Sequence, residues 1–420
     1  MNRRKKRPNF FSLIVLGLVL LFGYFFNEVY LPTQPNPFEL TPTPTRSAES
    51  FVTEAQTLFN EGKLLQSIDA YQQAVNSSPQ DSTLYVAMAR VQVFAGQYEE
   101  AESNAGNAIL LNPNNAMAHA VRAWALDFQD GKNAEATSSI EEALRIDPNN
   151  ALAHAYNVEV LISSGFDNYH KAADESRVAL ALDPNILETH RARGLILEAT
   201  ANYEEAIREF EAAIAINPNI PILHMELGRN YRILQVYDEA IKQFTIADTL
   251  NPGDPLPDLL ISRTYATIGE YAKSLQYAET AVRDRPDSAN LRGNLGVIYY
   301  RSLLWPEAVE QLGFTIYGGT TGDGVEITGL PLVNDILVAE YYYTYGLALA
   351  RTNQCGEALP IAQTLRTRIP SDENATFAAS EIDRICQENL DSPAVDTAEP
   401  TTVDEPVVTE TETPAITPTP

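Results

Sequence analysis

The small and apolar residues of this chain recur with a period of about 34 residues, and each period ends in a proline. The prolines that mark the period are Pro79, Pro113, Pro148, Pro184, Pro218, Pro252 and Pro286. The steps from each proline to the next are 34, 35, 36, 34, 34 and 34. A period of this length predicts stacked helical hairpins, which present an extended surface and rarely carry chemistry. Few segments alternate with period two, so a sheet domain is not expected.

Two consecutive units show the pattern most clearly. They read "HRARGLILEATANYEEAIREFEAAIAINPN" and "HMELGRNYRILQVYDEAIKQFTIADTLNPG". Their matching positions are Gly194 with Gly228, Tyr203 with Tyr237, Ala206 with Ala240, Phe210 with Phe244, Ala213 with Ala247 and Pro218 with Pro252. Glycine and alanine let the two helices of a hairpin approach closely, and the aromatic residue fills the gap to the next unit. Proline then ends the second helix.

These positions resemble tetratricopeptide repeats. Weaker units keep the register through Gly62, Gly96, Ser262, Gly296 and Gly346. The resemblance implies an all-α fold, an α-solenoid of about nine tetratricopeptide hairpins over residues 48–390. A helix from about residue 373 to 390 is expected to cap it, since terminal repeats must cover the last apolar face. The resemblance also implies a non-catalytic scaffold or adaptor that binds partner peptides in a concave groove lined by the first helices.

Arginine is frequent at the inward positions of these first helices. Counted from the aligned glycines, the expected partner-binding residues are Arg191, Arg229, Arg232, Arg263, Tyr300 and Arg301, and Arg351 continues the row. Arginine pairs well with carboxylates, and arginine with tyrosine is typical of interfaces. The alternative is that these arginines pair with acidic residues of adjacent helices.

The net charge argues against a nucleic-acid partner, and the absence of catalytic sequence motifs argues against an enzyme. The net charge is −27 although the first nine residues contribute +5, and so acidic a body is repelled by phosphate backbones. Nucleic acid is therefore not an expected partner. No metalloprotease, nucleophile-elbow or phosphate-binding motif is present, so we expect no enzyme, no cofactor and no small-molecule substrate.

Four histidines occupy the same position in successive units. They are His119, His154, His190 and His224. No cysteine or paired carboxylate accompanies them, so we interpret them as copied packing positions, and no metal site is expected.

Two other functions stay open. A cell-wall or glycan-associated binding module would use tyrosines as stacking platforms, and Tyr341, Tyr342, Tyr343 and Tyr345 cluster in the ninth unit. The other possibility is an autoinhibited surface, in which the acidic tail over residues 391–420 occupies the groove positions held by these arginines. That tail is rich in proline and threonine and is expected to be disordered.

The N-terminus predicts a membrane anchor. Residues 1–9 form a basic segment expected in the cytoplasm, and residues 10–31 are an apolar run expected to span the membrane once as a signal anchor. A cleaved signal peptide is the alternative, but no small-x-small cleavage site follows. Residues 32–47 are a Pro/Thr-rich linker. The solenoid would then lie outside the cytoplasm, and a bacterial cell membrane is favoured.

Two further features concern the end of the array. Cys355 and Cys386 are expected at the same end of the stack, where they form either a disulfide or two buried thiols. An insert at about residues 317–335 separates the eighth and ninth hairpins. Its β-prone stretch predicts a short hairpin or arm. It either forms a binding edge or folds back onto the helices through Ile327, Leu330 and Leu332.

Overall fold

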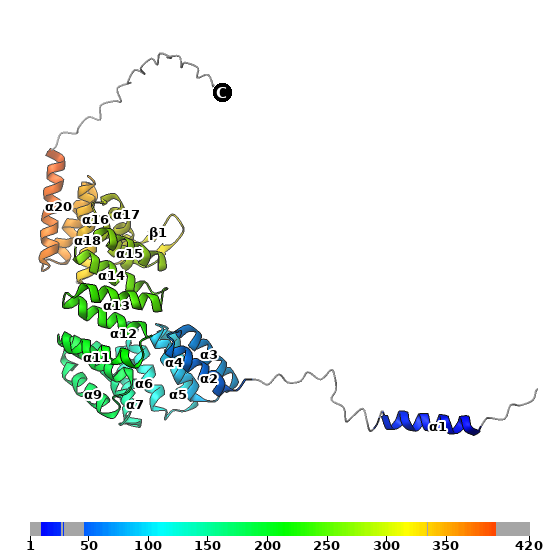
Figure 1. Ribbon diagram of the computed structural model, residues 1–420. Coiled ribbons are helices and arrows are strands. Elements are labelled where there is room, and N and C mark those ends of the chain that lie inside the picture. Colours follow the sequence, from blue (N-terminus) through cyan, green and yellow to red (C-terminus); the bar gives the residue numbers. More distant parts are fainter. Residues whose placement is uncertain (1–9, 27, 29–45, 334, 392–420) are drawn as a thin grey trace, which may run out of the picture. The chain divides into compact units, whose positions relative to one another are not determined.

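The structure is a computed structural model. It describes residues 10–26, 28, 46–333 and 335–391. The described residues divide into two compact units, one ending at Val160 and the other beginning at Leu161. Each unit is built from helices that pack against their sequence neighbours (Figure 1).

The first unit contains the helices of the first three hairpins and most of α8. They are α2 (Ala48–Asn60), α3 (Leu64–Ser77), α4 (Ser82–Phe94), α5 (Tyr98–Leu111), α6 (Ala116–Asp127), α7 (Asn133–Ile146) and α8 (Ala151–Ser163). Side-chain caps help to start them: Asp81 and Asn115 accept hydrogen bonds from backbone N–H groups of the first turn. Trp124 is 1% exposed and stacks on Tyr156 with ring centroids 4.4 Å apart, which makes an aromatic centre for this unit.

The second unit continues the same alternation of first and second helices. Its helices are η3 (Phe166–Asn168), α9 (Tyr169–Leu182), α10 (Leu187–Ala199), α11 (Tyr203–Ile216), α12 (Pro221–Ile233), α13 (Tyr237–Leu250), α14 (Pro255–Thr267), α15 (Tyr271–Asp284), α16 (Ala289–Arg301), α17 (Trp305–Tyr317), α18 (Ile336–Arg351), α19 (Cys355–Arg368) and α20 (Glu373–Asp391). Along the described residues, α2 to α19 make nine consecutive pairs in sequence. Helix α20 follows them and packs on α18 and α19.

The glycine and alanine positions explain why each pair packs closely. A Cβ atom added to Gly228 would lie 2.5 Å from the Phe244 ring, and one added to Gly194 would lie 2.7 Å from Phe210. Both phenylalanines are 0% exposed. Burying each ring contributes about 1.5–3 kcal/mol, and that contact requires the bare backbone opposite it.

The insert folds back onto the helices. Its strands β1 (Gly319–Thr320) and β2 (Glu326–Ile327) form a two-stranded antiparallel ladder. Ile327 is 6% exposed, and Leu330 and Leu332 pack against the core around α17 and α18. Backbone hydrogen bonding fixes this return, because the Leu330 amide donates to the Thr315 carbonyl oxygen at 2.8 Å.

The predicted single-pass membrane location is wrong. Helix α1 covers only Phe10–Phe25, which is 16 residues. At about 1.5 Å per residue it measures about 24 Å, less than the roughly 30 Å of a hydrocarbon core. In the part of the chain that the structure describes, no helix combines the length and the apolar character that crossing a membrane requires. The predicted cytoplasmic N-terminus and extracytoplasmic solenoid depended on that anchor and are not supported either.

Three predicted segments lie outside the described residues, and a fourth lies partly outside them. The three are the basic segment at 1–9, nearly all of the linker at 32–47, and the tail after Asp391. The fourth is the predicted anchor at 10–31, of which residues 27 and 29–31 are not described.

Candidate functional site

Three of the predicted arginines form one group in the second unit. Arg229 and Arg232 lie on α12 and Arg263 lies on α14. The positive charges of Arg263 and Arg229 both act on Arg232. We call these three residues the arginine row.

Arg232 is the member of the row with a buried donor that lacks a partner among the described residues. Its Nε atom is buried and has no hydrogen-bond partner among the residues that the structure describes. Burial, and then the charges of Arg263 and Arg229, lower the pKa of the Arg232 guanidinium. The charged form of Arg232 is therefore destabilised by lost solvation and by repulsion. An anion placed beside it would offset both of these unfavourable energies.

The other two members of the row are partly engaged. Arg229 Nε lies 3.4 Å from Glu198 Oε1, and the Arg229 side chain is 38% exposed. Arg263 donates from Nε to Asn294 Oδ1 at 3.2 Å and from Nη2 to the Tyr341 hydroxyl at 3.4 Å. These long contacts orient the guanidinium groups and leave donors unused, because each arginine offers five N–H groups.

The remaining predicted residues do not join the row. Arg191 is 2% exposed and is held by Glu226, with Nη2 and Oε1 2.7 Å apart, so its assignment to partner binding is corrected to a buried ion pair. Arg301 pairs with Glu340 at 2.8 Å on the surface. Tyr300 is half-buried against the core around α18. The alternative of pairing with neighbouring acids therefore describes Arg191 and Arg301, and it describes in part Arg229, which lies beside Glu198, and Arg351, which lies beside Glu381.

Arg351, which extends the predicted row, lies elsewhere in the unit. Its guanidinium carbon is 5.8 Å from the centre of the Trp305 ring, and Nη2 is 3.9 Å from Glu381.

The tyrosine cluster is mostly interior. Tyr341 is 1%, Tyr342 8% and Tyr345 4% exposed, and only Tyr343 is half-buried. The Tyr341 hydroxyl donates to the Asn290 carbonyl oxygen at 3.1 Å, and the Tyr342 hydroxyl donates to the Leu330 carbonyl oxygen at 2.9 Å. Rings held in this way cannot stack on a sugar, so the cluster gives the glycan hypothesis no platform.

The four repeated histidines have a structural role that the sequence analysis missed. Each ring places Nε2 within 2.8–3.0 Å of the carbonyl oxygen of the repeat proline six residues earlier. This bond ties the turn between hairpins to the next first helix. The signal was available in the sequence as a constant spacing of six between proline and histidine. Among the described residues, no group of three or more His, Cys, Asp or Glu side chains is arranged to hold a metal ion.

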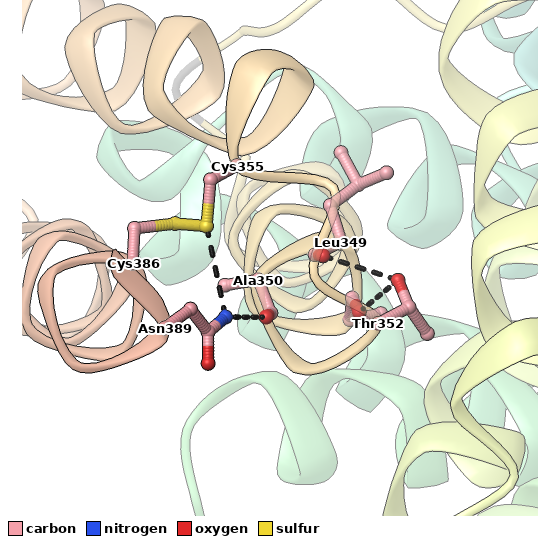
Figure 2. Close-up of a disulfide and its surroundings, with 7 residues drawn as sticks. Leu349, Ala350, Thr352, Cys355, Cys386 and Asn389 are labelled. Atoms are coloured by element: carbon pink, nitrogen blue, oxygen red, sulfur yellow. Dashed lines mark hydrogen bonds between the residues drawn. A yellow bond between two sulfur atoms is a disulfide. The ribbon is translucent and has the colours of Figure 1, made fainter. Parts of the chain in front are cut away.

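Cys355 and Cys386 form a disulfide in the structure, with Cα atoms 5.6 Å apart. It joins the start of α19 to the end of α20, and Figure 2 shows Asn389 beside it. The Asn389 amide donates to the Ala350 carbonyl oxygen at 3.0 Å, so α18, α19 and α20 are tied together at one place.

Comparison with known proteins identifies the repeats. Family models described as tetratricopeptide repeat match residues 187–220 and residues 86–151 and 259–313. A solved structure titled "Crystal structure of APC/C hetero-tetramer Cut9-Hcn1" matches with a TM-score of 0.57 and 11% identity, over 87% of this chain and 81% of that chain. At that identity the likeness shows the fold alone. No curated protein matches the sequence. The predicted family and the predicted all-α solenoid are confirmed.

Proposed function

Because this chain is a tetratricopeptide-repeat protein, and because such solenoids generally serve as interaction scaffolds without catalysis, we propose that it binds a partner protein through the arginine row. The chain performs no catalysis of its own in this proposal. An extended or helical segment of the partner lies along the first helices of the second unit and places a carboxylate beside Arg232.

The buried, unpartnered Nε atom of Arg232 is the observation that carries the proposal. The Nε atom is closed to solvent in the free chain, so a partner's carboxylate reaches it through a rearrangement of the Arg232 side chain. A bidentate carboxylate then supplies two oxygen acceptors in the plane of the donors. Arg263 and Arg229 raise the local positive charge in a chain whose net charge is −27. An acidic segment would therefore be attracted to this place and repelled by most of the remaining surface.

The similar solved structure gives supporting context. Its title describes a hetero-tetramer of Cut9 and Hcn1, so a solenoid of this fold takes part there in an assembly with another protein.

Selection of peptides on the intact protein tests the proposal. A displayed library of random dodecapeptides is selected on the immobilised full chain, and again on the Arg232→Met variant. Met retains most of the apolar stem and removes the charge. We expect sequences rich in Asp and Glu to be enriched on the native chain and lost on Arg232→Met.

A matched control uses Arg208→Met on α11, since Arg208 is 63% exposed and pairs with Glu205 in the same helix. This variant should select the same acidic peptides as the native chain. The proposal fails if no acidic peptides are enriched, or if Arg232→Met selects them equally well.

A further inference from the structure

Three consecutive hairpins of the second unit carry large apolar side chains in or beside the turn between their two helices. The hairpins are α12 with α13, α14 with α15, and α16 with α17. Each turn exposes two such side chains to solvent, and together they are Ile233, Val236, Ile268, Tyr271, Leu303 and Leu304. We call these six residues the turn edge.

The residues of the turn edge follow one another along one side of the unit. Helix α13 packs between α12 and α14, and α15 packs between α14 and α16, so the hairpins are stacked in chain order (Figure 1). In such a stack the turns of one kind lie along a single edge. The turns of the hairpins on either side, at residues 199–203 and 351–355, expose no large apolar side chain. The turn edge is therefore a bounded apolar strip, unlike the apolar residues that occur singly on any surface.

The backbone of Leu303 makes this position unusual. Its φ is 64°, in the left-handed region, and its side chain is 71% exposed. The same turn position holds Gln235 and Gly269 in the two preceding hairpins, also with positive φ. For a residue with a Cβ atom this conformation lowers the folded-to-unfolded ratio by a factor of roughly 5–30, which glycine avoids. A leucine here adds strain and little packing to the fold, which points to a contact with another molecule.

The charges beside the turn edge decide which kind of partner fits. The aligned stretches 233–240, 267–274 and 301–308 contain two basic residues, and both lie in ion pairs. The pairs are Lys273 with Glu270 and Arg301 with Glu340. Asp238 and Glu307 belong to the same stretches, are exposed, and form no ion pair with a described residue. The unbalanced charge at the turn edge is therefore negative, and it attracts lysine or arginine.

We propose that the turn edge is a second docking surface, which binds a partner segment whose large apolar side chains are flanked by lysine or arginine. The apolar side chains pack on Leu303, Ile268 and their neighbours, and the cations lie beside Asp238 and Glu307. The same charges disfavour other occupants. A second copy of the chain carries the same net charge of −27, and an anionic lipid surface is likewise repelled.

The turn edge is separate from the arginine row on which the proposed function depends. Ile233 follows Arg232 directly in sequence, so the two surfaces adjoin. They select opposite charges, because the row attracts an acidic segment and the turn edge attracts a basic one. Each surface can therefore be tested while the other is disabled.

The test removes an apolar side chain without weakening the fold. Leu303→Gly deletes the exposed side chain and adopts the positive φ without strain, so this variant should be at least as stable as the native chain. Ala201→Gly is the matched control, since it relieves a φ of 59° in a turn that exposes no large apolar side chain. Ile268→Ser changes a second exposed residue of the turn edge. Chemical denaturation of the full-length variants establishes that each is folded.

Peptide selection then tests the surface. Displayed random dodecapeptides are selected on the native full chain and on each variant. Peptides that combine lysine or arginine with large apolar residues should be enriched on the native chain, on Ala201→Gly and on Arg232→Met. They should be lost on Leu303→Gly, and a synthetic copy of the best peptide should bind that variant at least about tenfold more weakly. Its affinity for the native chain should fall as the salt concentration rises.

Three results would overturn the proposal. The first is that no such peptides are enriched, or that they bind Leu303→Gly and Ile268→Ser as well as the native chain. The second is that the peptides whose binding depends on Leu303 are acidic or uncharged. The third is self-association of the native chain, seen by light scattering and abolished by Leu303→Gly, which would make a second copy the occupant. Failure of the arginine row would leave these readings unchanged, because Arg232→Met keeps the turn edge intact.

Discussion

Opening the Cys355–Cys386 disulfide should release the capping helix α20. The two cysteines are separated by 31 residues in sequence. In the chain-entropy account, a cross-link closing a loop of about 32 residues stabilises the folded segment by about 4 kcal/mol. Helix α20 covers the end of the core with Ala375, Ile382 and Ile385, so this energy applies to the docking of the cap.

Hydrogen exchange measures that docking directly. Protection of the α20 amides is followed for the oxidised chain and for the chain reduced with a phosphine. A loss of about 4 kcal/mol lowers protection on the order of 10³-fold, since about 1.4 kcal/mol corresponds to a factor of ten. Helix α12 is the internal control and should keep its protection. The double variant Cys355→Ser, Cys386→Ser should behave like the reduced chain.

Two results would refute this reasoning. Unchanged protection of α20 after reduction would mean that apolar packing alone holds the cap. Two reactive thiols in the native chain, counted with a thiol reagent before any reduction, would mean that the disulfide does not form.

Two other substitutions test the packing of the second unit. Glu226→Gln leaves Arg191 buried beside a neutral partner and should destabilise the chain by about 3–5 kcal/mol. The midpoint of chemical denaturation should therefore fall to a lower denaturant concentration. An unchanged midpoint would show that the ion pair contributes little to stability. Gly228→Ala places a methyl group against the Phe244 ring and should lower the stability of the chain by about 1–3 kcal/mol, although alanine favours helix. In the control Gly106→Ala the added Cβ meets nothing within 4 Å, so this substitution should be stabilising or neutral. Equal effects at both sites would contradict the packing argument.

The repeat pattern allowed the helices to be predicted because their causes are local and periodic. Gly194 and Gly228 recur at one spacing since each must face a phenylalanine of its own hairpin, Phe210 for the first and Phe244 for the second. The proline period likewise marks where each second helix ends. Such features depend on residues close in sequence, so a single chain reveals them.

The role of each arginine depends on residues farther away. Arg191 meets Glu226 and Arg301 meets Glu340, at separations of 35 and 39 residues, across the boundary between consecutive repeats. Composition and register placed all of these arginines on first helices alike. Only the packed structure shows that Arg191 is enclosed while Arg232 keeps a buried Nε atom without a partner among the described residues.

The anchor was mispredicted for a different reason. The prediction extends the apolar run through residue 31, whereas α1 ends at Phe25, and residues 27 and 29–31 lie outside the described part of the chain. Length along a helix axis, and not apolar composition alone, decides whether a segment can span a bilayer.

The most direct test of the proposed binding is a double-mutant cycle between Arg232 and a peptide carboxylate. The acidic peptide selected on the full chain, and its counterpart with one Asp changed to Asn, are titrated by fluorescence anisotropy against the native chain and Arg232→Met. Charge-assisted pairing predicts a coupling energy of about 1.5 kcal/mol or more for one of the acidic positions. A coupling energy of zero at every acidic position would contradict the claim that Arg232 receives the partner's carboxylate.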